Sequence, residues 1–202
     1  MFYHQTDFEF SKQAKDWIVK QYAKQFNSEF FHDLNTFQWP DSIAANELRL
    51  FLKQYNCTTE YYGVSAFVSN SSNFFIGNPH IDLKFDQFGN SHRIQTRFNV
   101  LVQGTAQDEM VWWQDWRYGD SRLVDNTFKS LSGFSYTSKS IPGNTMEERW
   151  QCLGTPTETK SNLLVPSAFV KTDCAHTVSV SAGPRLIVTV AIDKPLHEII
   201  GP

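Results

Sequence analysis

Residues 175–192 read AHTVSVSAGPRLIVTVAI, and this stretch decides the fold. Residues 175–181 and 185–192 are runs rich in β-branched side chains, and a short turn containing Gly183 and Pro184 separates them. Two such runs around a Gly-Pro turn predict a pair of strands joined as a β-hairpin. Alternate residues of a strand point to the same side, which on the second run groups Arg185, Ile187, Thr189 and Ala191. We therefore expect Arg185 near the rim of the cavity that His176 enters.

Runs of the same kind recur along the chain from residue 60 onward. Residues with high strand propensity gather at 61–69, 81–85, 94–102, 109–116, 162–165, 174–180 and 186–192. Seven or eight short strands fit a double-sheet jelly roll, whose inward side chains meet solvent at one mouth. The sequence therefore predicts a mainly β protein, a double-stranded β-helix (jelly-roll) barrel with its core over residues 60–192.

The N-terminal part of the chain has the periodicity of helices. Residues 11–26 follow a plausible N-cap, Ser11, and carry apolar side chains close to a 3.6-residue period, at Ala14, Trp17, Ile18, Tyr22 and Phe26. A second such segment follows Pro40, where Asp41 or Ser42 can cap a helix with apolar residues at Ile43, Leu48, Phe51, Leu52 and Tyr55. We expect this helical support, residues 11–55, to buttress one sheet of the barrel from outside.

The bulk properties are those of one globular domain over residues 1–202. The net charge is −3 and the Lys and Arg residues are scattered, so there is no clear signal for nucleic-acid binding. No apolar run approaches the roughly 20 residues of a membrane span. The three cysteines are an odd number without paired spacing, and the chain begins without a basic and then apolar segment. These features predict a cytoplasmic protein, and they leave its oligomeric state open.

His80, Asp82 and His176 form a candidate metal site. In a strand, residues i and i+2 point to the same side, so His80 and Asp82 can face one ion while Ile81 faces away. Two imidazoles and one carboxylate leave other coordination positions open, which is the arrangement of non-haem Fe(II) oxygenases. A buried Arg185 near that site calls for a carboxylate, because its guanidinium pairs with a carboxylate through two hydrogen bonds.

His80-x-Asp82, the distal His176 and the basic Arg185 nine positions later resemble the signature of the Fe(II)/2-oxoglutarate-dependent oxygenase superfamily. The prolyl-hydroxylase-like branch is the most similar. Its last two core strands resemble the His-x-Val run at 176–178 and the Arg-x-x-x-Thr-Val run at 185–190, and its Arg-x-x-Thr strand resembles residues 93–96. The resemblance covers about residues 60–192, with a long unmatched stretch inside it.

The resemblance implies an activity and a set of cofactors. His80, Asp82 and His176 would bind Fe(II), Arg185 would hold the far carboxylate of the co-substrate 2-oxoglutarate, and O₂ would be the oxidant. The implied reaction hydroxylates a protein or peptide side chain or an amino acid, with succinate and CO₂ as co-products. Hydroxylation of a small metabolite or a nucleobase is an alternative. Another is a non-catalytic jelly-roll binding module whose His and Asp residues are ordinary core or rim polar groups.

Three further residues are candidates for binding the co-substrate. Thr189 shares the face of Arg185, so it either hydrogen-bonds the same carboxylate or simply packs in its strand. Family members of this branch commonly have a Tyr near the His-x-Asp motif, but this chain has none between residues 63 and 117. Asn99 is the nearest polar replacement and Arg97 shares its face. Each of these two residues has two alternatives. It contacts 2-oxoglutarate or substrate, or it is a polar residue of an exposed face.

Residues 117–160 interrupt the β pattern. They are rich in Ser, Thr, Gly and charge without clear periodicity, which predicts a partly ordered insertion with a loop tip at 130–140. The insertion either covers the substrate or is a solvated connection. Just before it, Trp112 and Trp113 point to opposite sides of a strand. One is expected in the core, and the other either floors a substrate groove or packs as an ordinary aromatic. Cys174 either is a small buried apolar residue or shares the face of His176.

Overall fold

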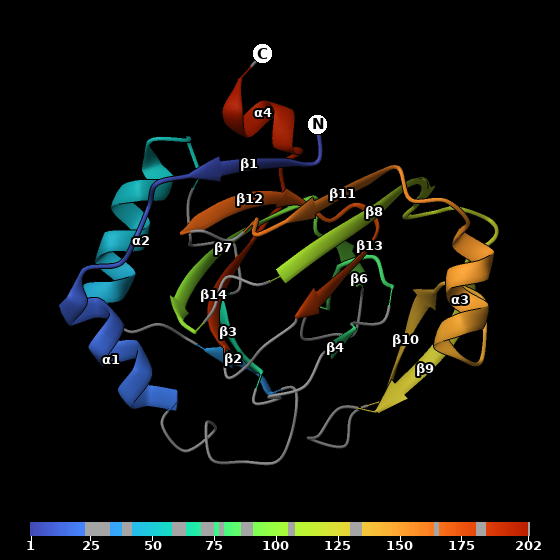
Figure 1. The fold of residues 1–202 in the computed structure, drawn as a ribbon, viewed down its shortest axis with the longest axis horizontal. Coiled ribbons are helices and arrows are strands. Elements are labelled where there is room, and N and C mark those ends of the chain that lie inside the picture. The colour runs from blue at the N-terminus through green and yellow to red at the C-terminus, as the bar shows by residue number, and fades with distance from the viewer. Residues whose placement is uncertain are drawn as a thin grey trace.

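The computed structural model describes residues 1–22, 33–37, 42–57, 64–69, 75–76, 79–85, 91–104, 108–129, 135–163, 166–180 and 185–201 (Figure 1). In chain order the elements are β1 (Tyr3–Thr6), α1 (Lys12–Tyr22), β2 (Asp33–Phe37), α2 (Ile43–Lys53), β3 (Val64–Ser69), β4 (Phe75–Ile76), β5 (Leu83–Phe85), β6 (Ser91–Arg93), β7 (Thr96–Gln103), β8 (Asp108–Arg117), β9 (Val124–Lys129), β10 (Ser135–Ser140), α3 (Met146–Leu153), β11 (Glu158–Ser161), β12 (Ser167–Lys171), β13 (Cys174–Val180), β14 (Arg185–Ile192) and α4 (Leu196–Ile200).

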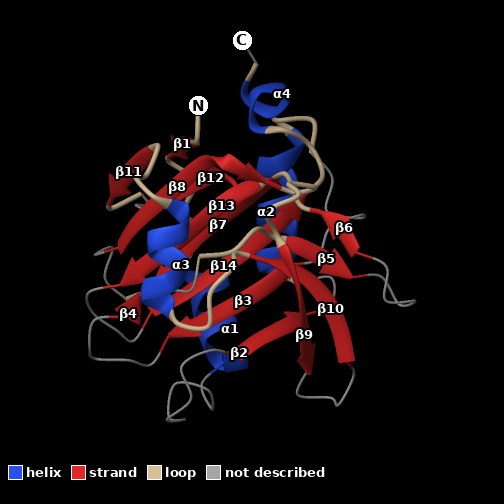
Figure 2. Ribbon diagram, turned by 90° about the vertical axis from the view of Figure 1, so that its right-hand side faces the viewer, coloured by secondary structure: helices blue, strands red, loops and turns tan. Residues whose placement is uncertain are grey.

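Two antiparallel sheets organise the protein, and strands make up most of its regular structure (Figure 2). One sheet has six strands in the order β1-β12-β7-β14-β3-β2, and the other has four in the order β11-β8-β13-β4. The chain passes repeatedly between them, since β7, β12 and β14 belong to the first sheet and β8, β11 and β13 to the second. The prediction of a mainly β protein is confirmed, and the arrangement is consistent with a β-sandwich or a jelly roll. Over the described residues the two sheets do not close into one barrel.

The outer face of the six-stranded sheet is covered by the N-terminal helices (Figure 1). The largest buried cluster joins Ala14 and Ile18 of α1 and Leu48 and Leu52 of α2 to alternate residues of the sheet, namely Phe98, Val100, Val102, Phe169, Leu186, Val188, Val190 and Ile192. Ser42 caps α2, because its side chain accepts a hydrogen bond from the backbone N–H of Ala45 at 3.2 Å. Helices α1 and α2 thus lie where the helical buttress of residues 11–55 was expected, while β2 within the same range joins the edge of the sheet by pairing with β3.

Replacement of Leu48 by Ala should strongly destabilise this outer cluster. Leu48 is 1 % exposed, so Leu48→Ala removes buried apolar surface and leaves a cavity, which lowers the free energy of unfolding by about 2 to 5 kcal/mol. Leu50 in the same helix is 68 % exposed, and Leu50→Ala should change the same quantity by less than about 0.5 kcal/mol. Urea unfolding of both variants measures the difference. Equal effects would contradict the assignment of this helix face to the core.

A second core lies between the two sheets, and a third lies on the outer face of the four-stranded sheet. The inner core contains Met110, Trp112, Leu163, Ala168, Val170, Cys174 and Ile187. The outer core contains Ile81, Val111, Trp113, Trp116, Leu123, Ile141, Leu153 and Ala175. Trp112 and Trp113 are thus buried on opposite sides of β8, and Trp113 contacts Trp150 of α3 edge to face with ring centroids 5.0 Å apart. Both tryptophans therefore pack as buried aromatic residues, which is the second of the two alternatives predicted for them.

Residues 117–160, predicted to be a partly ordered insertion, contain regular secondary structure over their described part. This segment contains the β9–β10 hairpin, α3 and β11, and β11 extends the four-stranded sheet. Residues 135–140 of the predicted loop tip form β10, and residues 130–134 lie outside the described residues. A capping box of Thr145 and Glu148 starts α3, whose Leu153 packs in the outer core. Helix α3 has one buried residue and the hairpin is rich in Ser and Thr, so neither shows a hydrophobic period.

Other short elements also depart from the prediction. The strand expected at 162–165 is absent over the described residues 162 and 163, because Asn162 has a left-handed φ of 52° and ends β11. Strands β1 and β2 were not predicted, since four or five residues are too few to show a period. Strand β1 pairs with β12, and β2 pairs with β3. None of the described helices is long and apolar enough to cross a membrane.

Candidate metal centre

His80 and His176 lie side by side because their backbones are bonded to each other. The N–H of each donates to the C=O of the other, both at 3.0 Å. This bridge is isolated, so the strand predicted from residue 81 begins at Leu83 and the His-x-Asp segment precedes it. The two imidazole ring centroids are 4.6 Å apart. The pairing places the two histidines, nearly one hundred residues apart in sequence, at one point.

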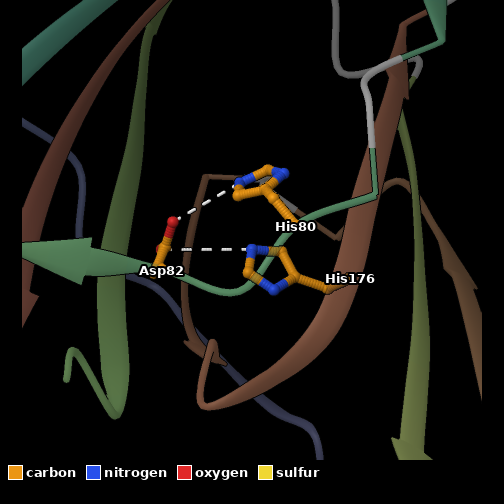
Figure 3. A group of neighbouring side chains, drawn as sticks. All are labelled: His80, Asp82 and His176. Carbon is orange, nitrogen blue, oxygen red and sulfur yellow. Dashed lines mark ion pairs between the residues drawn. The ribbon is translucent and has the colours of Figure 1, made fainter. Parts of the chain in front are cut away.

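Asp82 is brought to the same point by two further segments. Its N–H donates to the Thr172 carbonyl, and its own carbonyl accepts from the Ile94 N–H, both at 3.3 Å. Ile81 is buried in the outer core, so the alternation predicted for residues 80–82 holds without a regular strand. Figure 3 shows the three side chains pointing toward one another. An oxygen of Asp82 lies 3.4 Å from His80 Nε2, and its other oxygen lies 3.9 Å from His176 Nε2.

These three side chains fit a first-row divalent metal ion. One possible ligand atom from each lies within 4.8 Å of the others. Adjacent ligands with bonds of about 2.1 Å lie about 3 Å apart. The two distances from Asp82 oxygens to imidazole Nε2 atoms, 3.4 and 3.9 Å, are within about 1 Å of that value. Two imidazole nitrogens and a carboxylate oxygen suit Fe(II) with open positions. Among the described residues, His80, Asp82 and His176 are the one group of three or more such side chains with this spacing.

His176 has the correct protonation for a metal ligand. Its Nδ1 lies 3.0 Å from the carbonyl oxygen of Cys174, which orients the ring so that Nδ1 carries the hydrogen and Nε2 offers a lone pair toward Asp82. Burial, together with the charge of His80, lowers the pKa of His176 to about 4. The ring is therefore neutral near pH 7, as metal binding requires.

Asp82 is ionised, and Arg97 is the main cause. Burial raises the pKa of this carboxyl group, but the charge of Arg97, a hydrogen bond from His80 and the charges of both histidines together hold the pKa well below its usual range. Arg97 Nε donates to Asp82 Oδ2, and Arg97 Nη1 donates to Thr189 Oγ1 at 3.4 Å. The carboxylate is thus buried but paired, which keeps it available as an anionic ligand.

The predicted co-substrate residues lie on the inner face of the six-stranded sheet. Residues Leu186, Val188 and Val190 of β14 pack in the outer helix-covered cluster, so Arg185 and Thr189 face the other way, toward the sheet that carries His176. Arg185 is buried. Thr189 pairs with Asn99 across β14 and β7, and Phe98 and Val100 on either side of Asn99 face the helices.

The contact between Arg97 and Asp82 was missed by sequence reasoning, which considered Arg97 as a contact of co-substrate or substrate or as a polar residue of an exposed face. The carbonyls of Thr172 and Cys174 were missed as well. Backbone groups carry no sequence signal, and the pairing of residues 82 and 97 depends on the packing of separate segments. Cys174 shares the inner face of His176 and is buried, and burial raises the pKa of its thiol to about 12. Both features predicted for Cys174 are present, and its thiol stays protonated.

Comparisons with known proteins identify no family. Models of known protein families give no match, and neither do curated proteins. Among solved structures the chain is similar to the crystal structure of a viral collagen prolyl hydroxylase from Paramecium bursaria chlorella virus 1 in its 2OG complex. The TM-score is 0.44 and the sequence identity 11 %, over 95 % of this chain and 95 % of that chain. At this distance the likeness assigns no function, so the assignment rests on the geometry of the site.

The low pKa of His176 predicts that the metal-free protein loses stability as the pH falls from 7 to 5. The folded-state pKa of about 4 lies below the unfolded value of about 6.5, so in this range the unfolded chain binds a proton that the folded protein does not. The free energy of unfolding should fall by about 2 kcal/mol from this residue. Asp82 contributes in the same direction only below about pH 4, where the unfolded carboxyl group takes up its proton first.

Urea unfolding of metal-free protein at several pH values tests this prediction. His176→Gln should flatten the dependence between pH 7 and pH 5 by about 2 kcal/mol, whatever its effect at a single pH. His197 is exposed on α4, and His197→Gln serves as the matched control. A dependence as steep in His176→Gln as in the wild type would show that His176 is not held neutral in the folded state.

Proposed function

We propose that this protein is an Fe(II)/2-oxoglutarate-dependent oxygenase. One observation carries the proposal: the Nε2 atoms of His80 and His176 lie around the buried, ionised carboxylate of Asp82, on the side of the sandwich that Arg185 faces. Two imidazoles and one carboxylate oxygen leave three of the six coordination positions of an octahedral ion open. A buried arginine on the same inner face offers a partner for a carboxylate.

The chain's own residues would bind and orient the reactants. His80, Asp82 and His176 hold the ion, while Arg185 pairs with the far carboxylate of 2-oxoglutarate and Thr189 donates a hydrogen bond to it. Asn99, opposite Thr189 on β7, is the proposed further polar contact of the co-substrate. Bound Fe(II) supplies the coupling of O₂ to the oxidative decarboxylation of 2-oxoglutarate, which yields succinate and CO₂ and hydroxylates an unactivated C–H bond.

The finer fold that goes with this function is a jelly roll in a single domain over residues 1–202. Its support is the matching strand order of the two sheets. The order β3-β14-β7-β12 in one sheet corresponds to β4-β13-β8-β11 in the other, so each strand has its partner in number, β3 with β4, β7 with β8, β11 with β12 and β13 with β14, in the opposite sheet. In such a fold inward side chains from both sheets meet at one mouth, where His176 and Arg185 would lie.

The proposed substrate is a protein or peptide side chain or an amino acid. Support for this class is the resemblance of residues 176–178 and 185–190 to the prolyl-hydroxylase-like branch. Side-chain and amino-acid substrates are distinguished by following succinate formation with peptide pools and with free amino acids. Turnover with a nucleobase or another small metabolite alone would replace this substrate class and leave the cofactor assignment intact.

Anaerobic titration with Fe(II) and 2-oxoglutarate tests the cofactor assignment. A weak visible metal-to-ligand charge-transfer band should appear when the keto-acid end of 2-oxoglutarate chelates the bound ion, and His176→Ala should abolish it. Succinate should then form on admission of O₂. Absence of the band in correctly folded protein would reject the oxygenase and favour a non-catalytic binding module.

A further inference from the structure

The two oxygens of Asp82 have different surroundings. Oδ1 lies 3.4 Å from His80 Nε2. Oδ2 accepts a hydrogen bond from Arg97 Nε, so a full positive charge lies against that oxygen. The Arg97 guanidinium is itself held, because its Nη1 donates to Thr189 Oγ1. Oδ2 also lies 3.9 Å from His176 Nε2. Each oxygen of the carboxylate therefore faces one histidine, and Oδ2 is in addition bound to arginine.

This asymmetry matters because the proposed reaction needs a certain number of open coordination positions on the metal ion. An octahedral ion has six positions, of which two imidazoles and one carboxylate oxygen occupy three. A chelating keto acid needs two more and O₂ needs one. A carboxylate that binds through both oxygens takes a fourth position and leaves too few for both co-substrates. A partner that engages the second oxygen of Asp82 would keep that position open.

The backbone around Asp82 does not provide that restraint by itself. Asp82 lies outside the regular strands, and its N–H and C=O each make one hydrogen bond of 3.3 Å, which fixes its backbone and leaves the choice between its two oxygens open. Arg97, in contrast, belongs to β7, which is paired on one side with β12 and on the other with β14. Its side chain is 18 % exposed and is anchored at both Nε and Nη1. Arg97 is thus held by a strand that is paired on both sides, and its Nε is directed at one oxygen of Asp82.

We propose that Arg97 is a positioning residue of the metal centre, which holds one oxygen of Asp82 so that this ligand coordinates through its other oxygen only. The inference rests on the proposed function, since it concerns the same ion. It assigns Arg97 a role through Asp82 in place of direct contact with 2-oxoglutarate. The consequence is one additional open position on the ion.

The number of water molecules bound to the ion tests this role without any turnover. Mn(II) binds at sites of this kind, and the relaxation of water protons reports how many exchangeable waters it carries. In the Mn(II)-loaded wild type, without co-substrate, we expect about three waters on a six-coordinate ion. In Arg97→Met the freed oxygen of Asp82 should replace one of them, leaving about two. Loss of a direct contact between Arg97 and 2-oxoglutarate would not change this number.

Two further variants complete the experiment. Arg97→Lys keeps a cationic donor for Asp82 Oδ2 and should retain about three waters. Arg49 is exposed on α2 and donates to Asn46 in the same helix, so Arg49→Met is the control for the Arg to Met change itself and should also retain about three.

The outcomes separate this inference from the function on which it rests. Failure of the folded wild type to bind Mn(II) would reject the metal centre. Binding with about two waters in the wild type would overturn the role of Arg97 and leave the metal centre intact. About three bound waters in folded Arg97→Met, the same number as in the wild type, would also overturn the role of Arg97 and leave the metal centre intact. If Arg97→Met does not fold, the counts in the wild type and in Arg97→Lys decide.

Discussion

His176→Ala is expected to lower the affinity for Fe(II) or Mn(II) by at least about 100-fold. Loss of a residue that merely supports a ligand typically costs about 10- to 100-fold in metal affinity, and His176 is itself a proposed ligand. It is also the ligand that the structure prepares most fully, since the Cys174 carbonyl orients its ring and burial keeps it neutral. Anaerobic calorimetric titration of metal-free protein measures the change.

The fold should survive this substitution. His176 lies between the sheets, whereas the largest buried cluster lies between the six-stranded sheet and the N-terminal helices. The backbone pairing of residues 80 and 176 does not need the imidazole. Cooperative thermal unfolding of His176→Ala would confirm that the loss of metal is local, and His197→Ala on exposed α4 is the matched control. Wild-type metal affinity in folded His176→Ala would refute the proposed ligand set.

Arg185→Ala is expected to weaken 2-oxoglutarate binding by about 30- to 1000-fold and to leave metal affinity nearly unchanged. Truncation of one partner of a buried, hydrogen-bonded charge pair costs roughly 2 to 4 kcal/mol, which corresponds to that range. Arg185 is buried on the inner face of β14 and does not belong to the group that could hold the ion. Titration of 2-oxoglutarate into Mn(II)-loaded protein measures the effect.

Pyruvate supplies the sharpest control for this prediction. It carries the keto-acid end of 2-oxoglutarate but lacks the far carboxylate, so its binding should be nearly the same in the wild type and in Arg185→Ala. Arg185→Lys should recover part of the 2-oxoglutarate affinity, because the ammonium group keeps the charge but loses the planar pair of donors. Equal losses for both keto acids would indicate a general disturbance of the site, and unchanged 2-oxoglutarate affinity would show that Arg185 is not the clamp.

Elements with a long local pattern were predictable from the sequence. Helix α2 and its Ser42 cap follow from apolar spacing and a polar first residue, and strands β13 and β14 follow from β-branched residues around a turn. Elements without such a pattern could not be predicted, and the hairpin β9–β10 and helix α3 are examples. The strands of the hairpin pair with each other, and α3 contacts the outer core through Trp150 and Leu153, and neither arrangement produces a period in the sequence.

The same distinction holds within the candidate metal centre. The sequence by itself determined the types of ligand and the alternation that points His80 and Asp82 away from Ile81, because both follow from residue chemistry and backbone geometry. Only the tertiary structure decided that His80 pairs with His176, that Thr172 and Ile94 hold the backbone of Asp82, and that Arg97 binds its carboxylate. Those contacts join segments far apart in the chain, and their partners are chosen by the packing of two sheets, which no local pattern encodes.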